Sequence, residues 1–221
     1  MLFRSIEAEM QREIALKEVL KNQNRLLEVG APILEKSLPF CVDRKRKSIG
    51  ITFGNKHDYE GEYQGIAISK LGLGEPLEIT YVIKSSPAAK AGLKVGDILL
   101  SVNGKNIATG KNASKNFAKT LKKEIKENTA LSFEVIRNDL NQSYSVTPIE
   151  VCDYPLILTG DSAVNAFADG NSIYMTQGMM DFATADDELA LVIAHELAHN
   201  AMRHIDAKRT NAMGGLVIDI L

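Results

Sequence analysis

The chain has 221 residues, of which 26 are basic and 28 acidic, and its formal net charge is −2. This length fits one large domain or two small ones, and the balanced charge without a long single-sign run speaks against a nucleic-acid-binding surface. The longest apolar run, Leu189–Ala194, is far shorter than the roughly 18 residues of a membrane-spanning helix. No signal peptide is visible at the N-terminus, so we expect membrane association only through a leader absent from this sequence.

The first predicted element is helical and covers residues 2–38, where apolar side chains recur near helical spacing: Ile6, Met10, Ile14, Leu20 and Leu27. A coiled-coil arm is the alternative, but the irregular heptad favours packing on a globular body. The charged stretch Cys41–Ser48 then precedes a strand pattern at Ile49–Phe53. We therefore predict an N-terminal helical segment over 1–47, a second domain over 48–151 and a third over 152–221.

The second domain has the pattern of a small β-rich module. Strand patterns are found at residues 77–83, 130–137 and 143–151. A helix is predicted from about 112 to 126, because Phe117, Leu121 and Ile125 lie on one helical face. Asn and Asp between the last two strand patterns predict a hairpin turn.

The stretch Ser85–Ile107, SSPAAKAGLKVGDILLSVNGKNI, resembles the core signature of a PDZ domain of the bacterial protease-associated kind. The resemblance implies that a peptide adds as a strand beside a sheet edge, with its carboxylate held by backbone N–H groups of a Gly-containing loop. Ser48–Phe53 corresponds to that loop and the strand after it. The implied peptide-binding residues are Ile49, Gly50 and Ile51.

Three further features belong to this module. Ser86-Pro87 predicts the start of a short helix, and Asn103-Gly104 predicts a tight turn. The insert Gly54–Pro76 departs from the PDZ pattern and could fold as a helix across the groove. The alternative that the module is a spacer or lid, binding no free peptide, stays open.

The last segment, from Cys152 onward, predicts a hairpin over Asn165–Thr176 that turns at Asp169-Gly170. A helix should follow from about Ala185 to beyond residue 199, with Thr184 as its N-cap. Three acidic residues in the first turn suit the helix macrodipole.

That helix carries the sequence HELAH at residues 195–199. His195 and His199 are one turn apart, so both imidazoles can reach one ion, and neutral imidazole suits Zn²⁺. Glu196 points about 100° away from His195 and is placed to take a proton from water as the general base. This arrangement is typical of zinc metalloproteases, and two structural histidines are the alternative.

Taken together, the hairpin, the capped helix and the motif resemble the HtpX-like and BepA-like gluzincin zinc metallopeptidases, over about residues 152–221. The resemblance implies one Zn²⁺ per complete active site, held by His195, His199 and a glutamate from a later helix, with Glu196 as the base. Asn165, Ala166 and Phe167 would line the cleft and pair with an extended substrate. The predicted fold class is therefore α+β, with a PDZ-like β-rich module inserted into a mainly helical gluzincin body.

No glutamate follows Glu196, so we expect this sequence to hold only the first half of a zinc site and to be metal-poor and proteolytically inactive. Asp206 should lie about 10 Å beyond His199 along the helix. Asp219 could reach the site only if the chain reverses, and His204 should face away in a structural or supporting role. The apolar C-terminal residues could mediate self-association.

The leading hypothesis is a zinc-dependent endopeptidase of cell-envelope protein quality control, which acts on protein or peptide substrates that the PDZ-like module restricts or delivers. A non-enzymatic peptide-binding module on a metallopeptidase-derived scaffold is the alternative. Cys41 and Cys152 lie just outside the module, whose ends should be adjacent, which predicts a disulfide between them; two buried thiols are the alternative. A disulfide would favour a periplasmic or envelope-associated location, and a cytoplasmic one stays open.

Overall fold

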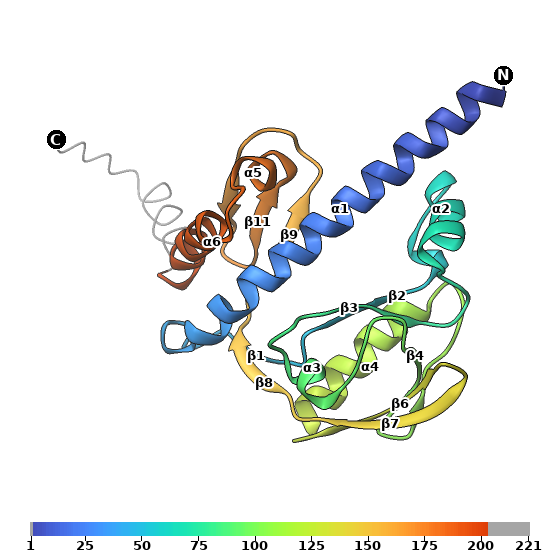
Figure 1. Cartoon of the computed structure of the whole chain (residues 1–221). Helices are drawn as coiled ribbons and strands as arrows, with labels where there is room; N and C mark the ends of the chain where they lie inside the picture. Colours follow the sequence, from blue (N-terminus) through green and yellow to red (C-terminus); the bar gives the residue numbers. More distant parts are fainter. Residues whose placement is uncertain (1, 203–221) are drawn as a thin grey trace. The chain divides into compact units, whose positions relative to one another are not determined.

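The computed structural model describes residues 2–202, and by internal contacts the chain divides into two compact units (Figure 1). Unit 1 comprises residues 1–24 and 47–149, and unit 2 comprises residues 25–46 and the chain from 150 onward. None of the described helices is both long and apolar enough to cross a membrane. The predicted N-terminal helical segment contains one continuous helix, α1 (Leu2–Lys36), whose two parts group with different units, and a short 3₁₀ turn follows at Leu38–Phe40.

The chain has an α+β fold, as predicted, and unit 1 combines an antiparallel sheet with helices. Its strands are β2 (Ile51–Gly54), β3 (Glu78–Val82), β4 (Ile98–Val102), β5 (Lys105–Asn106), β6 (Leu131–Arg137) and β7 (Leu140–Val146). Its helices, besides the start of α1, are α2 (Glu62–Leu71), α3 (Pro87–Ala91) and α4 (Ala113–Glu127), with a short 3₁₀ turn at Lys56–Asp58. The sheet has the order β2-β3-β4-β6-β7, with β5 on β4, so β2 lies at one edge. All its paired strands are antiparallel.

Two tight turns in unit 1 lie where the sequence predicts them. Asn103 and Gly104 have φ of 49° and 72°, and β5 follows them as the antiparallel neighbour of β4. Asn138 and Asp139 have φ of 51° and 60° and join β6 to β7. Positive φ at both central residues matches the twist of a two-residue hairpin and is tolerated best by Gly, Asn and Asp.

The core of unit 1 forms where α4 packs on the sheet. Phe117 and Leu121 are buried, as the helical spacing predicts, and the Phe117 ring meets the Phe53 ring edge to face with centroids 4.6 Å apart. α3 begins with Pro87 after Ser86, whose hydroxyl accepts a hydrogen bond from the Ala89 N–H, as expected of an N-cap.

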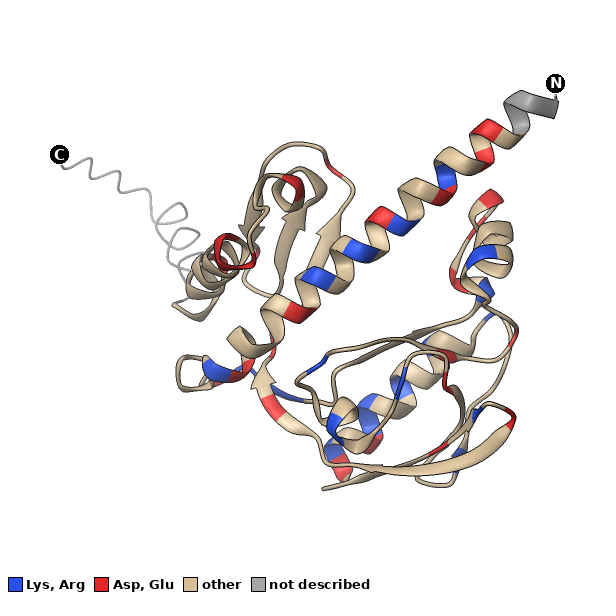
Figure 2. Cartoon of the chain, in the orientation of Figure 1, with Lys and Arg blue, Asp and Glu red and all other residues tan. Residues whose placement is uncertain are grey.

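The insert forms a helix, α2, and its charged side chains pair with α1 inside unit 1. Arg12 lies 2.5 Å from Glu62, and Lys70 lies 3.2 Å from Glu13. Figure 2 shows acidic and basic residues interspersed along α1, which makes such pairs available. Exposed pairs of this kind stabilise a structure only modestly.

A buried ion pair joins the start of β4 to the end of β6. The Arg137 guanidinium donates from Nε and one terminal nitrogen to the two Asp97 carboxylate oxygens, each at 2.6 Å, and Asp97 is fully buried. A further Arg137 N–H donates to the Gly92 carbonyl, and the Lys94 N–H donates to Asp97. Hydrogen bonding to the Asp97 carboxylate raises the pKa of Arg137 above its ordinary value.

Removal of the Asp97 charge should therefore destabilise unit 1. Asp97→Asn leaves Arg137 without its buried counter-ion, and we expect the free energy of unfolding to fall by about 3 kcal/mol. Urea denaturation followed by circular dichroism measures the change. Asp139→Asn, which removes an exposed carboxylate at a turn, is the matched control and should change stability by less than about 0.5 kcal/mol. A similar small change for Asp97→Asn would contradict the expectation.

Unit 2 contains the second part of α1, the helices α5 (Gln177–Phe182) and α6 (Asp186–Ala201), and a sheet of β9 (Leu156–Thr159), β10 (Ala166–Ala168) and β11 (Ile173–Thr176). The sheet order is β10-β11-β9, with β10 antiparallel and β9 parallel to β11. The predicted hairpin is present as β10–β11, and β9 and α5 are additional. The core of this unit combines one face of α6 with residues from α1, α5 and the sheet: Leu26, Met175, Met180, Ala183, Leu189 and Ile193.

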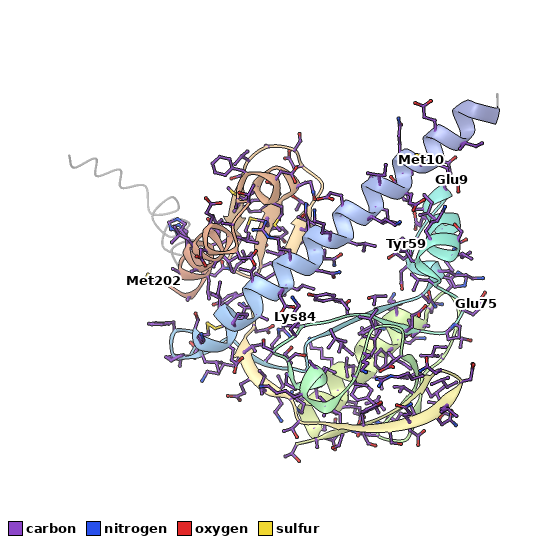
Figure 3. The ribbon with its side chains drawn as sticks, in the orientation of Figure 1. Glu9, Met10, Tyr59, Glu75, Lys84 and Met202 are labelled. Atoms are coloured by element: carbon purple, nitrogen blue, oxygen red, sulfur yellow. A yellow bond between two sulfur atoms is a disulfide. The ribbon has the colours of Figure 1, made fainter. Side chains whose placement is uncertain are left out.

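The strands β1 (Lys45–Ser48) and β8 (Ile149–Cys152) pair in a two-stranded sheet where the chain passes between the units. Close by, Cys41 and Cys152 form a disulfide with a Cα separation of 5.6 Å, which confirms the predicted bridge (Figure 3). Both cysteines are buried. The segment that contains the PDZ-like module is thus closed at its two ends by a covalent link.

Loss of this bridge should destabilise unit 2, to which both cysteines belong. A cross-link over a sequence separation of 111 residues is worth up to about 4–5 kcal/mol in the chain-entropy model. We expect the double variant Cys41→Ser, Cys152→Ser to lose much of this in urea denaturation. Reductant should lower the stability of the wild-type chain equally and leave the double variant unchanged. A wild-type transition insensitive to reductant would show that the bridge contributes nothing.

Candidate functional site

The motif helix α6 has a buried face and an outward face. Leu189, Ile193 and Leu197 are almost fully buried at helical spacing. His195 is exposed, whereas Glu196 and His199 are half-buried. The apolar stripe therefore fixes the rotation of α6, and this rotation turns the motif side chains away from the core of unit 2.

The two imidazoles converge on one point. Their Nε2 atoms lie 3.1 Å apart, and the rings meet edge to face with centroids 4.7 Å apart. Two nitrogen ligands of a tetrahedral zinc ion, each about 2.0–2.1 Å from the metal, would lie about 3.3 Å from each other. The pair His195 and His199 therefore fits two adjacent positions of a zinc coordination sphere.

A complete zinc coordination sphere needs further ligands beside His195 and His199. Within residues 2–202, no group of three His, Cys, Asp or Glu side chains is arranged to hold a metal ion. The candidates His204, Asp206 and Asp219, the expected lack of a later glutamate ligand and the apolar C-terminal residues all concern positions outside the described residues. They stay predictions.

The start of α6 differs from the prediction, because Ala185 and not Thr184 occupies the N-cap. The Ala185 N–H donates to the Glu188 carboxylate at 3.1 Å. The Thr184 carbonyl instead accepts a hydrogen bond from Arg25 at 3.1 Å, and the same guanidinium donates to Asp186 at 2.8 Å. The Thr184 cap was wrong because this distant arginine fixes the segment before the helix, which local sequence does not reveal.

Thr176, at the end of β11, organises the chain around Asn165. Its buried hydroxyl lies 2.6 Å from the Ala163 carbonyl and 2.7 Å from the Asn165 carbonyl, and accepts from the Asn165 N–H at 3.1 Å. The same oxygen accepts from the Met179 N–H and so caps α5. The loop before β10 also passes so close to Gly178 that a Cβ there would lie 2.1 Å from the Ser162 carbonyl oxygen. These contacts thus fix the backbone conformation of the loop before β10.

The candidate substrate residues Asn165, Ala166 and Phe167 lie at or next to the edge strand β10. Asn165 uses its backbone carbonyl and N–H toward Thr176, and the Asp169 N–H donates to the Ser172 carbonyl. Because hydrogen-bonding direction alternates along a strand, Ala166 and Ala168 direct their backbone groups to the open edge. Phe167 stacks on Tyr174 with centroids 4.7 Å apart. A strand added at this edge would therefore pair with Ala166 and Ala168, of which the sequence analysis named only Ala166.

The turn between β10 and β11 is built around Asp169. Its carboxylate accepts hydrogen bonds from the N–H groups of Asn171 and Ser172, each at 2.7 Å, and from the Tyr174 hydroxyl at 3.2 Å. Partial burial pushes the pKa of Asp169 upward, but these hydrogen bonds outweigh it, so the pKa lies below its ordinary value. The carboxylate form that holds the turn is therefore the favoured one.

The second candidate site is the loop before β2 in unit 1. The Ile49 carbonyl accepts from the Ala88 N–H and the Gly50 carbonyl accepts from the Ile83 N–H, each at 3.0 Å. In a planar trans peptide the N–H points opposite to the carbonyl, so the N–H groups of Gly50 and Ile51 leave on the other side. Gly50 has φ of 75°, and a Cβ there would lie 2.3 Å from Ser86 Cβ. Glycine is therefore required for this loop geometry.

Both regions match known protein families. Residues 78–116 match the family model of the PDZ domain, and residues 148–218 match the model of Peptidase family M48. These two matches support a metalloprotease-type hydrolase with a PDZ module.

Solved structures with similarity to the chain include the HtrA3 PDZ domain bound to a phage-derived ligand, FGRWV. The two sequences are 19% identical, and the match covers 48% of this chain and 88% of that chain with a TM-score of 0.35. The serine endoprotease from Yersinia pestis is 22% identical, with 55% of this chain and 35% of that chain covered and a TM-score of 0.33. The PDZ domain of EpsC from Vibrio cholerae is 16% identical, with 45% of this chain and 94% of that chain covered and a TM-score of 0.28.

Proposed function

We propose that the protein is a zinc-dependent endopeptidase of cell-envelope protein quality control, in which the PDZ domain restricts or delivers protein substrates. The observation that carries the proposal is the convergence of the His195 and His199 Nε2 atoms at 3.1 Å on the outward face of α6. The match to Peptidase family M48 supports the same chemistry. The Cys41–Cys152 disulfide supports a periplasmic or envelope-associated location, since such bonds persist in oxidising compartments.

In this proposal each motif residue has a separate task. His195 and His199 would hold Zn²⁺ through Nε2, and the ion would supply Lewis acidity to the scissile carbonyl and to the attacking water. Glu196 takes a proton from that water as its oxygen bonds to the carbonyl carbon. The same carboxyl group then gives the proton to the leaving amine as the peptide C–N bond breaks. The edge of β10 would hold the substrate backbone in an extended form.

Variants of the motif, made in an enzyme whose zinc site is complete, should separate metal binding from proton transfer. His195→Ala should weaken zinc binding at least about tenfold in calorimetry, because one of the converging nitrogens is lost. Glu196→Gln should bind zinc within about threefold of wild type but lower kcat for peptide hydrolysis by at least about 10²-fold. His57→Ala, which removes an imidazole in unit 1, is the matched control and should change neither quantity. Unchanged zinc binding by His195→Ala would refute the assignment of the metal site.

A second function, the capture of peptide C-termini, is favoured by the loop before β2. The N–H groups of Gly50 and Ile51, directed away from the Ile83 and Ala88 contacts, suit a carboxylate. β2 lies at the sheet edge, where a peptide could add as a strand, and Ile51 and Phe53 border the core of unit 1. If both functions are combined, the loop before β2 and the edge of β2 select chains with exposed C-termini for the peptidase segment. In the non-enzymatic alternative this capture is the whole function.

Peptide binding should depend on the free carboxylate. Peptides with an aliphatic C-terminal residue should bind at least about tenfold more tightly as acids than as C-terminal amides, because only the acid form offers charged acceptors to the N–H groups. Fluorescence polarisation measures both. Gly50→Ala should abolish the difference, whereas Gly61→Ala, also at positive φ but with nothing within 4 Å of the added Cβ, should retain it. Equal affinity for acid and amide would rule out carboxylate recognition.

A further inference from the structure

Asn200 is a buried polar residue at the end of an apolar helix face. It continues the stripe formed by Leu189, Ile193 and Leu197 and is 2% exposed. Its Nδ2 donates to the Ser172 carbonyl at 2.9 Å, and its Oδ1 accepts from the Gly170 N–H at 2.7 Å. A buried amide is costly unless both its donor and its acceptor are satisfied, and here the β10–β11 turn satisfies them.

The turn that Asn200 holds is itself stiff. Gly170 has φ of 92°, and the Asp169 carboxylate fixes the N–H groups on the far side of the turn. Asn200 therefore contacts a stiff turn at two points, the Gly170 N–H and the Ser172 carbonyl. Apolar contacts between α6 and the hairpin have no preferred direction, whereas these two hydrogen bonds determine how far the hairpin can slide along the helix.

The position of this turn sets the position of β10. The strand has three residues between the turn and the Asn165–Thr176 contacts, so a shift of the turn moves the outward backbone groups of Ala166 and Ala168. Asn200 directly follows His199, and about 100° separates successive side chains on a helix. One residue thus faces the predicted metal site and the next faces the hairpin, which links the strand edge to the motif within one turn of α6.

We propose that Asn200 is a positioning residue that sets the register between the HELAH helix and the substrate-pairing edge of β10. The proposal rests on the endopeptidase function argued above. Asn200 touches neither the metal site nor the substrate; it acts through the turn at Gly170 and Ser172. A substrate strand paired with Ala166 and Ala168 then presents its scissile carbonyl at the point where His195, Glu196 and His199 act.

The test uses Asn200→Ala and Asn200→Asp in the given chain for hydrogen exchange, and in an enzyme whose zinc site is complete for zinc affinity and kcat. Asn200→Ala should increase amide hydrogen exchange at Gly170 at least about tenfold, because its acceptor is lost. Zinc affinity should stay within about threefold of wild type. Since a misplacement of about 1 Å can cost about 10²-fold in rate, kcat for peptide hydrolysis should fall by roughly that factor, with KM changed by less than about threefold. Asn200→Asp retains the acceptor toward Gly170 and should keep part of its protection.

The matched control is Asn171→Ala, an exposed residue on the same turn whose side chain accepts a hydrogen bond from Arg44. It should leave Gly170 exchange and kcat close to wild type. Wild-type exchange at Gly170 in Asn200→Ala would refute the positioning role of Asn200. A wild-type kcat of Asn200→Ala would also refute it, provided that Glu196→Gln is inactive. If Glu196→Gln instead cleaves normally, the endopeptidase proposal fails, and the exchange measurement, which needs neither zinc nor hydrolysis, still decides whether Asn200 holds the turn.

Discussion

The buried stripe of α6 is the constraint on which the candidate peptidase site depends. The direction of a side chain on a helix is set by the rotation of that helix. Rotation of α6 is prevented by Leu189 and Ile193 in the core of unit 2 and by the buried Leu197. The motif side chains face outward as a consequence of this packing. The local four-residue spacing then brings the two imidazole nitrogens together.

Features that depend on local chemistry were predictable from the sequence. The positive φ at Asn103-Gly104 and at Asn138-Asp139 follows from residue types that tolerate this conformation. Helix α4 follows from the spacing of Phe117 and Leu121, and the convergence of the motif histidines follows from the pitch of a helix. The disulfide was also predictable, since a module with adjacent ends brings its flanking residues together.

Features that depend on distant partners were not predictable in the same way. The strand β1 consists of KRKS, a charged run with no strand signature, and it forms because β8 lies beside it. Thr184 has the right chemistry for an N-cap, yet Arg25 on α1 engages its carbonyl and the cap moves to Ala185. Thr176 and Asn200 carry no motif, because their importance lies in carbonyl and N–H groups far along the chain.

The two sites use backbone geometry in the same way. In unit 1, carbonyls of the loop at Ile49 and Gly50 are engaged by the Ile83–Ala88 segment, which leaves N–H groups on the opposite side. In unit 2, Asn165 is engaged by Thr176, which leaves the groups of Ala166 and Ala168 at the open edge. A backbone group can recognise an extended chain only if its direction is fixed before the ligand arrives, because ordering it on binding costs conformational entropy. The contacts at Ser86, Thr176 and Asn200 therefore fix the backbone geometry on which the proposed binding at both edges depends.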